Sequence, residues 1–403
     1  MVKRVAVTGL GIVTAHGLGP EANWTGIQAG ASGIRDIESF DAAPYRGRMG
    51  GEAEGFEGIP VRNVKRTRLD RASLLLLQTV RDAITDAGIE GSLGSTPVLL
   101  SLGTTLGGML SGQAFHREVL RKGLRRARLS LTLDYLAHHQ PMHLFGELGL
   151  QGDSMVFSNA CASGANAIGH AFRSIRNGHC EIAICGGYDT MSEFTFAGFN
   201  SLMAVSPTLC RPFDRNRDGL VLGEGAGILI LEGMDRALRR NARIVSEITG
   251  YGESSDAYHL TSPDPSAQQA SRAIMNALRE AGCETVDYIN AHGTGTKYND
   301  SMEARAIRES FGDKAGSIPV SSIKPMIGHL LGGAGAVEAV VSILSILHKT
   351  VPPNINYDTP DPECDLCIAR EALARNVKTV LSNSFGFGGS NASLVVREYP
   401  WEG

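Results

Sequence analysis

Residues 155–166 read MVFSNACASGAN, and they place a cysteine between an apolar strand and a helix. The strand is expected at 155–159 and the helix at 165–176, which leaves Cys161 in the turn that joins them. Unpaired N–H groups at the start of a helix favour a thiolate, and small neighbours leave the sulfur accessible. The stretch therefore predicts a nucleophilic Cys161 with a lowered pKa. Taken alone, it also fits a buried structural cysteine.

The alternation of strand and helix continues on both sides of this turn. Short apolar runs predict strands, and amphipathic segments with a period of 3.6 residues predict helices. We expect strands at 3–8, 97–103, 155–159, 181–185, 226–231, 244–250, 288–291, 319–322, 377–383 and 392–398, and helices at 68–88, 165–176, 266–281, 301–311 and 335–348. This order predicts an α/β protein with a mostly parallel, buried sheet.

A second stretch of the chain is similar to the first. Residues 382–388 read SNSFGFG after an apolar strand, as SNACASG does at residues 158–164. Because each half also contains a strand–helix series, the pattern indicates an internal duplication. We expect two domains, 1–245 and 246–403, that form one compact body because no flexible linker separates them.

Two histidines follow strands of the C-terminal half. His292 lies in NAHGTGT, residues 290–296, and His329 ends KPMIGH, residues 324–329, just before the helix that carries Glu338. Each histidine is a usable acid or base, although each alone also fits a structural role. Since strand-to-helix junctions of an open α/β sheet share one edge, we expect Cys161 and the two histidines to converge. The glycines in FGFGGSN, residues 385–391, allow backbone N–H groups to form an oxyanion hole, or only a turn.

Composition excludes several classes of protein. The 403 residues carry a net charge of −4, which gives no support to nucleic-acid binding. The first 15 residues have no long apolar stretch, and the longest apolar run, near 336–347, is interrupted, so we expect neither a signal peptide nor a membrane span. An odd count of seven cysteines favours free thiols in the cytoplasm. The 49 glycines indicate many tight turns and close backbone contacts.

Three motifs are expected to be unrelated to function. TGLGIVT, residues 8–14, is an incomplete dinucleotide fingerprint. Cys364 and Cys367 form a single Cys-x-x-Cys pair with no second pair. The histidines at 138, 139 and 143 lie in a stretch that reads as a loop without acidic partners. We therefore expect no metal.

Together these motifs resemble the β-ketoacyl-acyl-carrier-protein synthases of the elongating Cys-His-His type, within the thiolase-like superfamily. The resemblance runs from VAVTGLG at residues 5–11, through RPFD at 211–214, RDG at 217–219 and GEGAG at 223–227, to NSFGFGG at 383–389. It implies a thiolase-like fold in which two duplicated α/β halves form a five-layered α-β-α-β-α body. It also implies decarboxylative Claisen condensation that extends an acyl chain by two carbons, an acyltransferase reaction.

The resemblance implies a role for each motif residue. Cys161 accepts the acyl group, His292 and His329 bind the malonyl thioester carbonyl, and Cys161 and Phe387 donate the oxyanion-hole N–H groups, with Phe387 also a gate. Lys324 and Glu338 support the histidines. The substrate-binding residues are Thr294, Thr296, Leu106 and Phe385. Substrates arrive on the phosphopantetheine of an acyl carrier protein, and no cofactor is bound permanently.

Two basic clusters are candidates for docking the acidic carrier protein. The first comprises Arg62, Lys65, Arg66, Arg68 and Arg71, and the second lies at residues 121–128. The resemblance favours the first cluster, together with Arg211. Residues 122–141 differ from the common fatty-acid pattern. A ketosynthase subunit of a type II polyketide or polyene synthase, paired with a chain-length partner, is therefore the alternative to a homodimeric fatty-acid enzyme. A thiolase-like degradative enzyme and a non-catalytic partner subunit are less consistent with His329 and Cys161.

Overall fold

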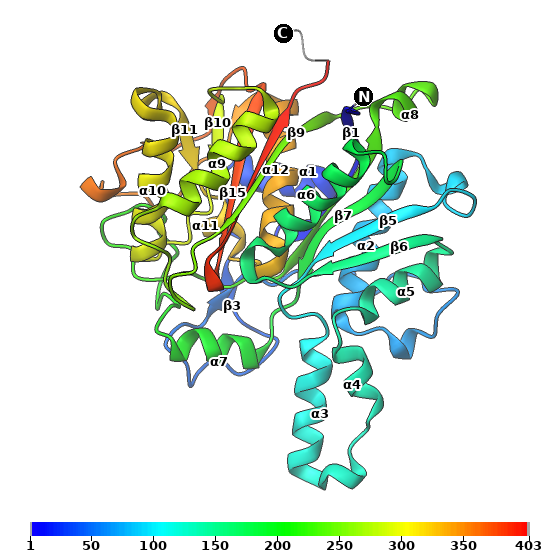
Figure 1. Ribbon diagram of the computed structural model, residues 1–403. Coiled ribbons are helices and arrows are strands. Elements are labelled where there is room, and N and C mark those ends of the chain that lie inside the picture. The colour runs from blue at the N-terminus through cyan, green and yellow to red at the C-terminus, as the bar shows by residue number, and fades with distance from the viewer. Residues whose placement is uncertain (1, 401–403) are drawn as a thin grey trace.

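The computed structural model describes residues 2–400 of the chain, and one sheet of 12 strands forms its centre (Figure 1). The strand order is β13-β11-β10-β15-β16-β9-β1-β8-β7-β5-β6, with β2 paired to β1. The bounds are β1 Val5–Thr14, β2 Gly17–Leu18, β5 Val98–Gly103, β6 Gly152–Phe157, β7 Ile182–Asp189, β8 Gly225–Gly233, β9 Ser246–Ser255, β10 Tyr288–Asn290, β11 Pro319–Ser321, β13 Cys367–Ile368, β15 Thr379–Gly386 and β16 Ser390–Arg397. Each predicted strand is present within a few residues, and β1 is the one that extends furthest beyond its expected end.

The sheet is mixed, so the expectation of a mostly parallel sheet is wrong. Strands β5, β6 and β7 pair in parallel, as do β10, β11, β13 and β15. The remaining pairs, which include β8 with both of its neighbours, are antiparallel. Apolar runs of this kind do not reveal strand direction. In this sheet, strands with antiparallel neighbours such as β8 are buried on both faces of the sheet, as strands of a parallel sheet are.

The strand order repeats between the two parts of the chain. The series β6-β5-β7-β8-β1 has the same order and the same directions as β11-β10-β15-β16-β9, and the two series meet where β1 pairs with β9. This repetition supports the predicted duplication. The domain boundary at residue 245 stays a prediction.

Helices form three layers around the two halves of the sheet. Helices α6 (Ser163–Arg176) and α12 (Ala334–His348) contact strands of both halves and form the middle layer. Helices α2 (Arg71–Ala87) and α5 (His139–Leu148) cover the N-terminal half, and α9 (Gln268–Ala281) and α10 (Lys297–Phe311) cover the C-terminal half. The five layers are those of the thiolase-like fold.

The central position of α12 explains why this helix is so apolar. The segment Leu331–His348 is long and apolar enough to span a membrane, which corrects the expectation that no run reaches that length. It is 89% buried between the two halves of the sheet, as a core helix of a globular protein is.

The glycines at residues 9 and 11 allow a helix to pack closely on β1. A Cβ atom on Gly11 would lie 2.1 Å from the carbonyl oxygen of Thr79 in α2. The Asp70 side chain caps the start of α2 by accepting from the backbone N–H of Ser73 at 2.8 Å, and Gly88 ends the helix in the left-handed conformation. Gly9 and Gly11 therefore serve the packing of α2 on β1. This role fits a motif that was expected not to bind a dinucleotide.

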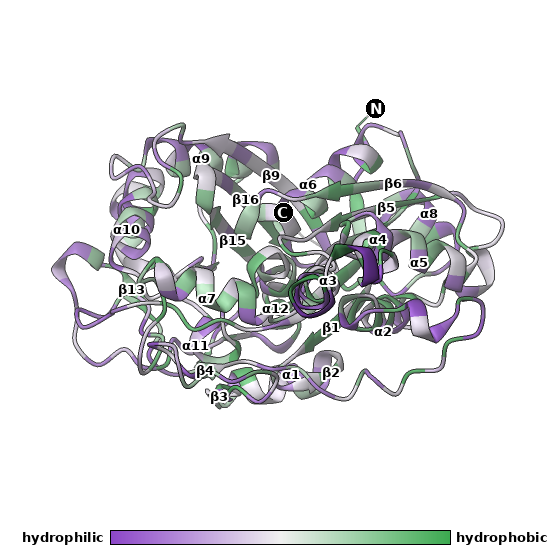
Figure 2. Ribbon diagram, turned by 90° about the horizontal axis from the view of Figure 1, so that it is seen from below, coloured by the Kyte–Doolittle hydropathy of each residue, from purple (hydrophilic) through white to green (hydrophobic). Residues whose placement is uncertain are grey.

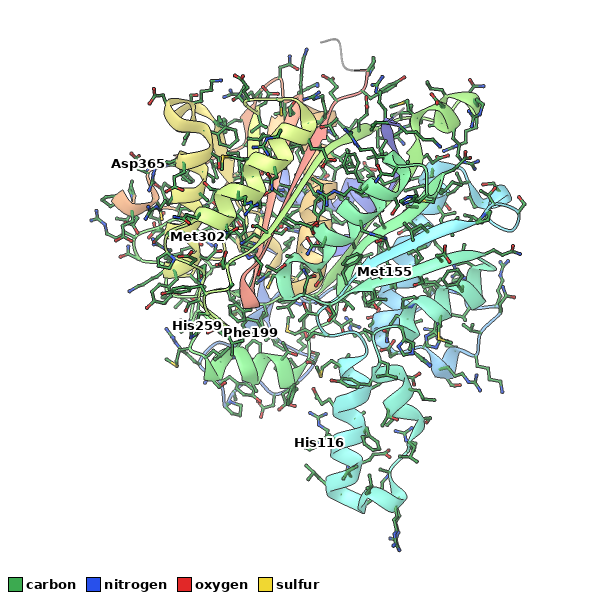
Figure 3. The ribbon with its side chains drawn as sticks, in the orientation of Figure 1. His116, Met155, Phe199, His259, Met302 and Asp365 are labelled. Atoms are coloured by element: carbon green, nitrogen blue, oxygen red, sulfur yellow. The ribbon has the colours of Figure 1, made fainter. Side chains whose placement is uncertain are left out.

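A helical hairpin projects from the body of the molecule (Figure 1). It consists of α3 (Met109–Lys122) and α4 (Ser130–Tyr135), and His116 lies along it (Figure 3). The view from below shows strongly hydrophilic segments in this hairpin (Figure 2), in keeping with the arginines at 121–128. The hairpin also exposes apolar side chains, namely Leu120, Leu124, Leu129, Leu133, Tyr135 and Leu136.

The hairpin leads into the histidine cluster, whose environment differs from expectation. His139 and His143 lie on α5 rather than in a loop, and Asp134 supplies an acidic neighbour, with its Oδ1 at 3.2 Å from Nδ1 of His139. Ligand atoms of these three residues lie within 4.8 Å of one another. The reasons given above against a metal site here are therefore wrong, although the expectation that no metal is bound stays a prediction.

Candidate active site

Cys161 lies in a short 3-10 turn, Ala160–Ala162, between β6 and α6. The preceding residue, Ala160, has a φ of 56°, an unfavourable value for a residue with a Cβ atom. This sharp turn holds the cysteine between strand and helix, as a nucleophile elbow does. The side chain is 5% exposed, and its sulfur borders a cavity.

The structure brings Cys161 and both histidines together. Nε2 of His329 lies 3.0 Å from Sγ of Cys161. The rings of His292 and His329 meet edge to face, with centroids 5.3 Å apart. These three residues follow strands β6, β10 and β11. Strands β10 and β11 are parallel neighbours, whereas β6 belongs to the other half of the sheet, and the two halves pair antiparallel through β1 and β9. The site therefore forms where strand ends of both halves meet, and not at one edge of a parallel sheet. The predicted convergence is confirmed.

Burial controls the protonation of these groups. It raises the pKa of the Cys161 thiol to about 12, against the smaller lowering effects of the Lys324 ammonium and a hydrogen bond from the Phe387 backbone. The expected lowering of this pKa is therefore wrong for the free enzyme, in which the sulfur is desolvated. Burial also holds the pKa values of His292 and His329 well below the ordinary range, and Lys324 adds to this effect. Near neutral pH the site thus contains a thiol and two neutral imidazoles.

Lys324 and Glu338 form a buried ion pair behind His292. The Lys324 ammonium donates to Glu338 and to the backbone oxygen of His292, and both side chains are at most 2% exposed. Its Nζ also lies 3.5 Å from Nδ1 of His292. Because an ammonium only donates, this contact favours the tautomer in which Nδ1 accepts and Nε2 carries the hydrogen. The supporting positions expected for Lys324 and Glu338 match this geometry.

Glu303 holds the loop that carries His292. This role was not predicted from the sequence. Its carboxylate accepts from the backbone N–H groups of His292 and Gly293, both at 2.8 Å, and from the amide of Asn383 at 3.2 Å. Burial raises its pKa to about 7. An acidic residue on the buried face of the predicted helix 301–311 was the available signal, because such a residue requires a polar partner.

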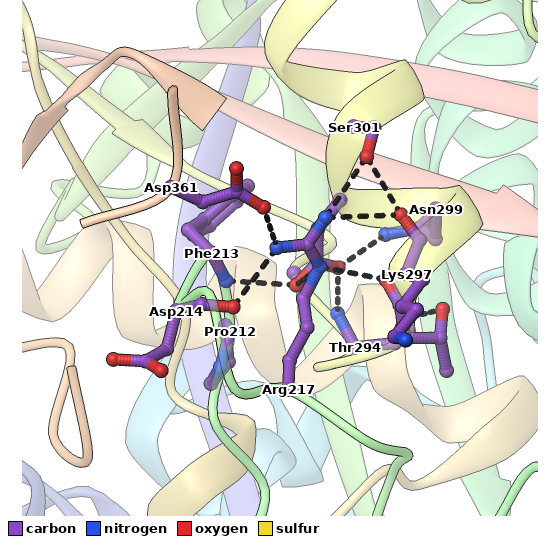
Figure 4. Close-up of polar contacts among 12 residues, drawn as sticks. Pro212, Phe213, Asp214, Arg217, Thr294, Lys297, Asn299, Ser301 and Asp361 are labelled. Carbon is purple, nitrogen blue, oxygen red and sulfur yellow. Dashed lines mark hydrogen bonds and ion pairs between the residues drawn. The ribbon is translucent and has the colours of Figure 1, made fainter. Parts of the chain in front are cut away.

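A second carboxylate, Asp300, fixes the next part of this loop; Figure 4 labels three of its neighbours, Phe213, Arg217 and Thr294. It accepts from the backbone N–H of Thr294 at 3.1 Å and from that of Phe213 at 2.8 Å. The buried guanidinium of Arg217 lies 3.9 Å from it and also donates to Asp361. The RPFD and RDG motifs thus anchor the loop that carries Thr294.

The glycine-rich segment after β15 approaches the cysteine closely. A Cβ atom on Gly386 would lie 3.1 Å from the backbone nitrogen of Cys161, closer than most Cβ contacts, so glycine favours this approach. The ring of Phe387 stacks on Phe199, with centroids 5.6 Å apart. Phe199 belongs to α7 (Glu193–Ser201) and lies at the lower left of the view in Figure 3. No pattern in the sequence predicts this partner of Phe387.

A cavity of about 420 Å³ leads from the surface to the cysteine. Seven of the ten predicted catalytic, oxyanion-hole and substrate-binding residues line it, namely Cys161, His292, Thr294, Thr296, His329, Phe385 and Phe387. The hydroxyl oxygens of Thr294 and Thr296 lie 2.9 Å apart along its wall. Leu106 is not among the described residues that line the cavity; it is buried in an apolar cluster with Phe196, Met191 and Leu331.

The predicted docking residues also lie outside the cavity wall. None of Arg62, Lys65, Arg66, Arg68 and Arg211 is among the described residues that line it. Arg46 and Lys297 do line it, and the sequence analysis did not single them out. All seven cysteines are free thiols, including Cys364 and Cys367.

Comparisons with known proteins agree with this geometry. Residues 2–237 match the N-terminal domain of the β-ketoacyl synthases, and residues 245–358 match the C-terminal domain. The chain is 41% identical over 409 residues to 3-oxoacyl-[acyl-carrier-protein] synthase 2 of Synechocystis sp., with 98% of each chain covered. It is 38% identical over 406 residues to the protein of that name from Coxiella burnetii, again with 98% of each covered.

Solved structures show the same architecture. The ishigamide ketosynthase/chain length factor matches with a TM-score of 0.95 and 36% identity, covering 99% of this chain and 100% of the other. A β-ketoacyl synthase from Burkholderia phymatum matches with a TM-score of 0.91 and 33% identity, covering 98% and 99%. A type II polyketide ketosynthase solved with its acyl-carrier protein matches with a TM-score of 0.86 and 29% identity, covering 99% and 100%. The chain therefore belongs to the β-ketoacyl synthase family of acyltransferases.

Proposed function

We propose that the protein catalyses decarboxylative condensation of a malonyl group with an acyl group held on Cys161, with both substrates delivered on the phosphopantetheine of an acyl carrier protein. The observation that carries this proposal is the meeting of the Cys161 sulfur with His329, at 3.0 Å, and of His329 with His292 at the inner end of one cavity. The shape of the cavity suits a long, flexible arm that carries a thioester at its tip.

Acyl transfer begins with the neutral thiol of Cys161. In the tautomer that leaves its Nε2 free, His329 accepts the thiol proton as the sulfur attacks the thioester carbonyl. The backbone N–H groups of Cys161 and Phe387 stabilise the oxyanion. The carrier thiolate then leaves and takes the proton from Nε2 of His329, so that the imidazole is neutral again and Cys161 holds the acyl group as a thioester.

Malonyl decarboxylation uses the other side of the site. The Lys324 ammonium favours Nε2–H on His292, so this imidazole donates a hydrogen bond to the malonyl thioester oxygen. His329 donates a second hydrogen bond to the same oxygen once its Nε2 carries hydrogen. Negative charge develops on that oxygen as carbon dioxide leaves, so both donors stabilise the enolate more than the substrate.

Condensation joins the two halves of the reaction. The enolate carbon attacks the Cys161 thioester, and the cysteine sulfur leaves as a thiolate that regains a proton. The product is a 3-oxoacyl thioester two carbons longer, still attached to the carrier. Entry of the acyl chain requires Phe387 to move from Phe199, and Gly388 and Gly389, both with φ of 79°, provide the backbone freedom next to it.

The carrier protein docks on basic residues around the cavity. Thr294 and Thr296 bind the phosphopantetheine arm along the wall, and Arg46 and Lys297 lie where the arm enters. The cluster of Arg62, Lys65, Arg66 and Arg68, together with Arg211, attracts the acidic carrier over a longer range, since complementary charge raises association rates.

A second ketosynthase chain completes the assembly, and we propose that it is a copy of this one. Strand β6 is an edge of the sheet and exposes Met155 by 46% (Figure 3), and the α3–α4 hairpin exposes its leucines. Unpaired edges and exposed apolar side chains of this kind are typical of subunit interfaces. The seven free thiols favour a cytoplasmic location for this dimer.

The principal pathway is fatty-acid elongation, supported by 41% identity to a 3-oxoacyl-[acyl-carrier-protein] synthase 2. The second candidate is polyene or polyketide synthesis with a chain-length-factor-like partner. The TM-score of 0.95 against the ishigamide ketosynthase/chain length factor favours it.

One experiment tests the function and separates the pathways. The purified protein is supplied with malonyl carrier protein and acyl carrier proteins of graded length, and products are identified by mass spectrometry. A single 3-oxoacyl product two carbons longer supports the fatty-acid role. Condensation only after addition of a related partner chain supports the second candidate, and absence of condensation in both cases rejects the proposal.

A further inference from the structure

Asp189 is a fully buried carboxylate close to the active site. It ends strand β7 and is 0% exposed. Among residues 2–400, no arginine or lysine pairs with it; its charge is met by hydrogen-bond donors alone. Burial raises its pKa to about 6, against the effect of these donors. A buried carboxylate without a cation is costly, so its position requires an explanation beyond core packing.

The donors come from two loops that belong to different halves of the site. Oδ1 accepts from the Thr104 hydroxyl at 2.6 Å and from the Leu106 backbone N–H at 2.9 Å. Oδ2 accepts from the backbone N–H of Thr105 at 2.9 Å and from that of Gly332 at 2.6 Å. Residues 104–106 follow β5, whereas Gly332 lies three residues after His329.

The two loops touch each other where the carboxylate joins them. A Cβ atom on Gly332 would lie 2.4 Å from the backbone nitrogen of Thr105, so the backbones are in direct contact. Leu106 and Leu331 also belong to the same apolar cluster. One side chain thus connects the segment expected to border the acyl chain with the segment that positions His329 against Cys161.

We propose that Asp189 is a positioning residue that fixes the His329 loop relative to the 104–106 loop. Through this link it sets both the efficiency of the steps that use His329 and the acyl-length preference. The inference rests on the proposed function and deepens it.

The chemistry of the contact suggests a sharp substitution. Each carboxylate oxygen accepts from two donors, so the amide of Asp189→Asn places its NH2 group against two N–H or O–H donors in either orientation. The side chain keeps its size while the link between the loops is broken. Thr104→Val is the milder variant, because it removes one donor to Asp189, together with the acceptor of the Gly107 backbone N–H, and leaves the contact to Gly332 intact.

Asp214→Asn provides a matched control elsewhere in the fold. Asp214 is 1% exposed and accepts from the backbone N–H groups of Asn216, Asp358 and Thr359 at 2.6–2.8 Å. It too is a buried carboxylate that organises loops, and the hydrogen-bond partners of its side chain among residues 2–400 lie outside the His329 loop. Its substitution reports the cost of losing such a contact in general.

The experiment compares three variants by partial reactions and hydrogen exchange. For Asp189→Asn we expect the two steps that use His329, acyl transfer to Cys161 and malonyl decarboxylation, to fall about 10- to 100-fold further than in Asp214→Asn, because small displacements of a catalytic group have effects of that size. We also expect a changed acyl-length profile, and faster exchange at both 104–106 and 329–333. Thr104→Val should loosen mainly the first segment, and Asp214→Asn neither.

Equal reduction of all partial reactions in Asp189→Asn and Asp214→Asn, with an unchanged length profile, would overturn the inference. Unchanged exchange at 329–333 would overturn it as well, whether or not the enzyme is active. If Asp189→Asn fails to fold, Thr104→Val provides the test instead. Unchanged hydrogen exchange at residues 104–106 together with an unchanged acyl-length profile would then reject the positioning role of Asp189. Failure of the proposed function is distinguishable, since it would show as absence of condensation by the unsubstituted protein.

Discussion

The two halves of the sheet repeat one topology but contribute different chemistry at equivalent places. In the N-terminal half, strands β5, β6 and β7 lead to the 104–106 loop, Cys161 and Asp189. In the C-terminal half, the equivalent strands β10, β11 and β15 lead to His292, the segment from Lys324 to His329, and Phe387. The duplicated framework therefore brings six strand ends to one site and leaves the side chains free to differ.

The halves also stabilise their site residues differently. The N-terminal half uses a sharp turn at Ala160 and a carboxylate held by N–H groups without a cation. The C-terminal half buries a lysine–glutamate pair and the carboxylate of Glu303 behind His292. A nucleophile requires a fixed and accessible backbone turn. Imidazoles that must stay neutral are favoured by a nearby cation, which lowers their pKa and fixes their tautomer.

The strongest way to separate the halves is to remove the nucleophile. Cys161→Ala is expected to abolish acyl transfer and to lower condensation by at least about 1,000-fold, because no other group accepts the acyl chain. Malonyl decarboxylation should continue, since the histidine side is intact. The measurement is the initial rate of each partial reaction. Cys180→Ala, a partly buried thiol outside the cavity wall, serves as the control and should retain all rates.

The converse substitution acts on the C-terminal half. His292→Ala should lower malonyl decarboxylation by about 100- to 1,000-fold, the cost of losing one hydrogen-bond donor to a developing oxyanion. Acyl transfer to Cys161 should fall far less, because His329 is the imidazole that contacts the sulfur. Rapid-quench measurements of both steps test this. An equal loss of both steps would contradict the separation of roles between the halves.

The ion pair behind His292 provides a stability test. Lys324→Met leaves Glu338 buried without its partner, and breaking such a pair costs about 3–5 kcal/mol of unfolding free energy. The double variant Lys324→Met/Glu338→Leu should recover much of this loss, because it leaves no uncompensated charge. Urea unfolding of the three proteins provides the comparison. If the double variant recovers none of the lost unfolding free energy, the buried, unpaired charge of Glu338 is not the cause of the loss in Lys324→Met.

The smallest expected effect concerns pH. Burial lowers the pKa values of His292 and His329 in the folded protein, so below the unfolded value of about 6.5 the unfolded chain binds more protons. The stability due to the neutral histidines is therefore complete above that pH and is lost as pH falls towards their folded pKa values. The slope is about 1.4 kcal/mol per pH unit for each histidine. His292→Asn should reduce this slope in urea unfolding curves; an unchanged slope would contradict the assignment.

Much of the fold and the centre of the site are predictable from the sequence. Apolar runs and helical periodicity locate the main strands and helices, and strand ends predict the meeting of Cys161, His292 and His329. Strand direction is not predictable in this way, because runs such as β8 are buried on both faces whichever way their neighbours run. The mixed sheet was therefore missed.

Other features depend on contacts between distant parts of the chain. The pKa of Cys161 follows from burial beneath the Phe387 segment, which the helix start next to the cysteine does not reveal. Asp189, Glu303 and Phe199 act through partners that only folding brings close. Leu106 is not among the described residues of the cavity wall; it packs in an apolar cluster with Met191, Phe196 and Leu331.

The most direct test of the central claim is the identity of the acylated residue. The protein is incubated with an acyl-carrier thioester, digested and analysed by mass spectrometry. One acyl mass on the peptide that contains Cys161, and none in Cys161→Ala, is the predicted result. An acyl group on any other residue, or no acyl group while an established ketosynthase is labelled under the same conditions, would contradict it.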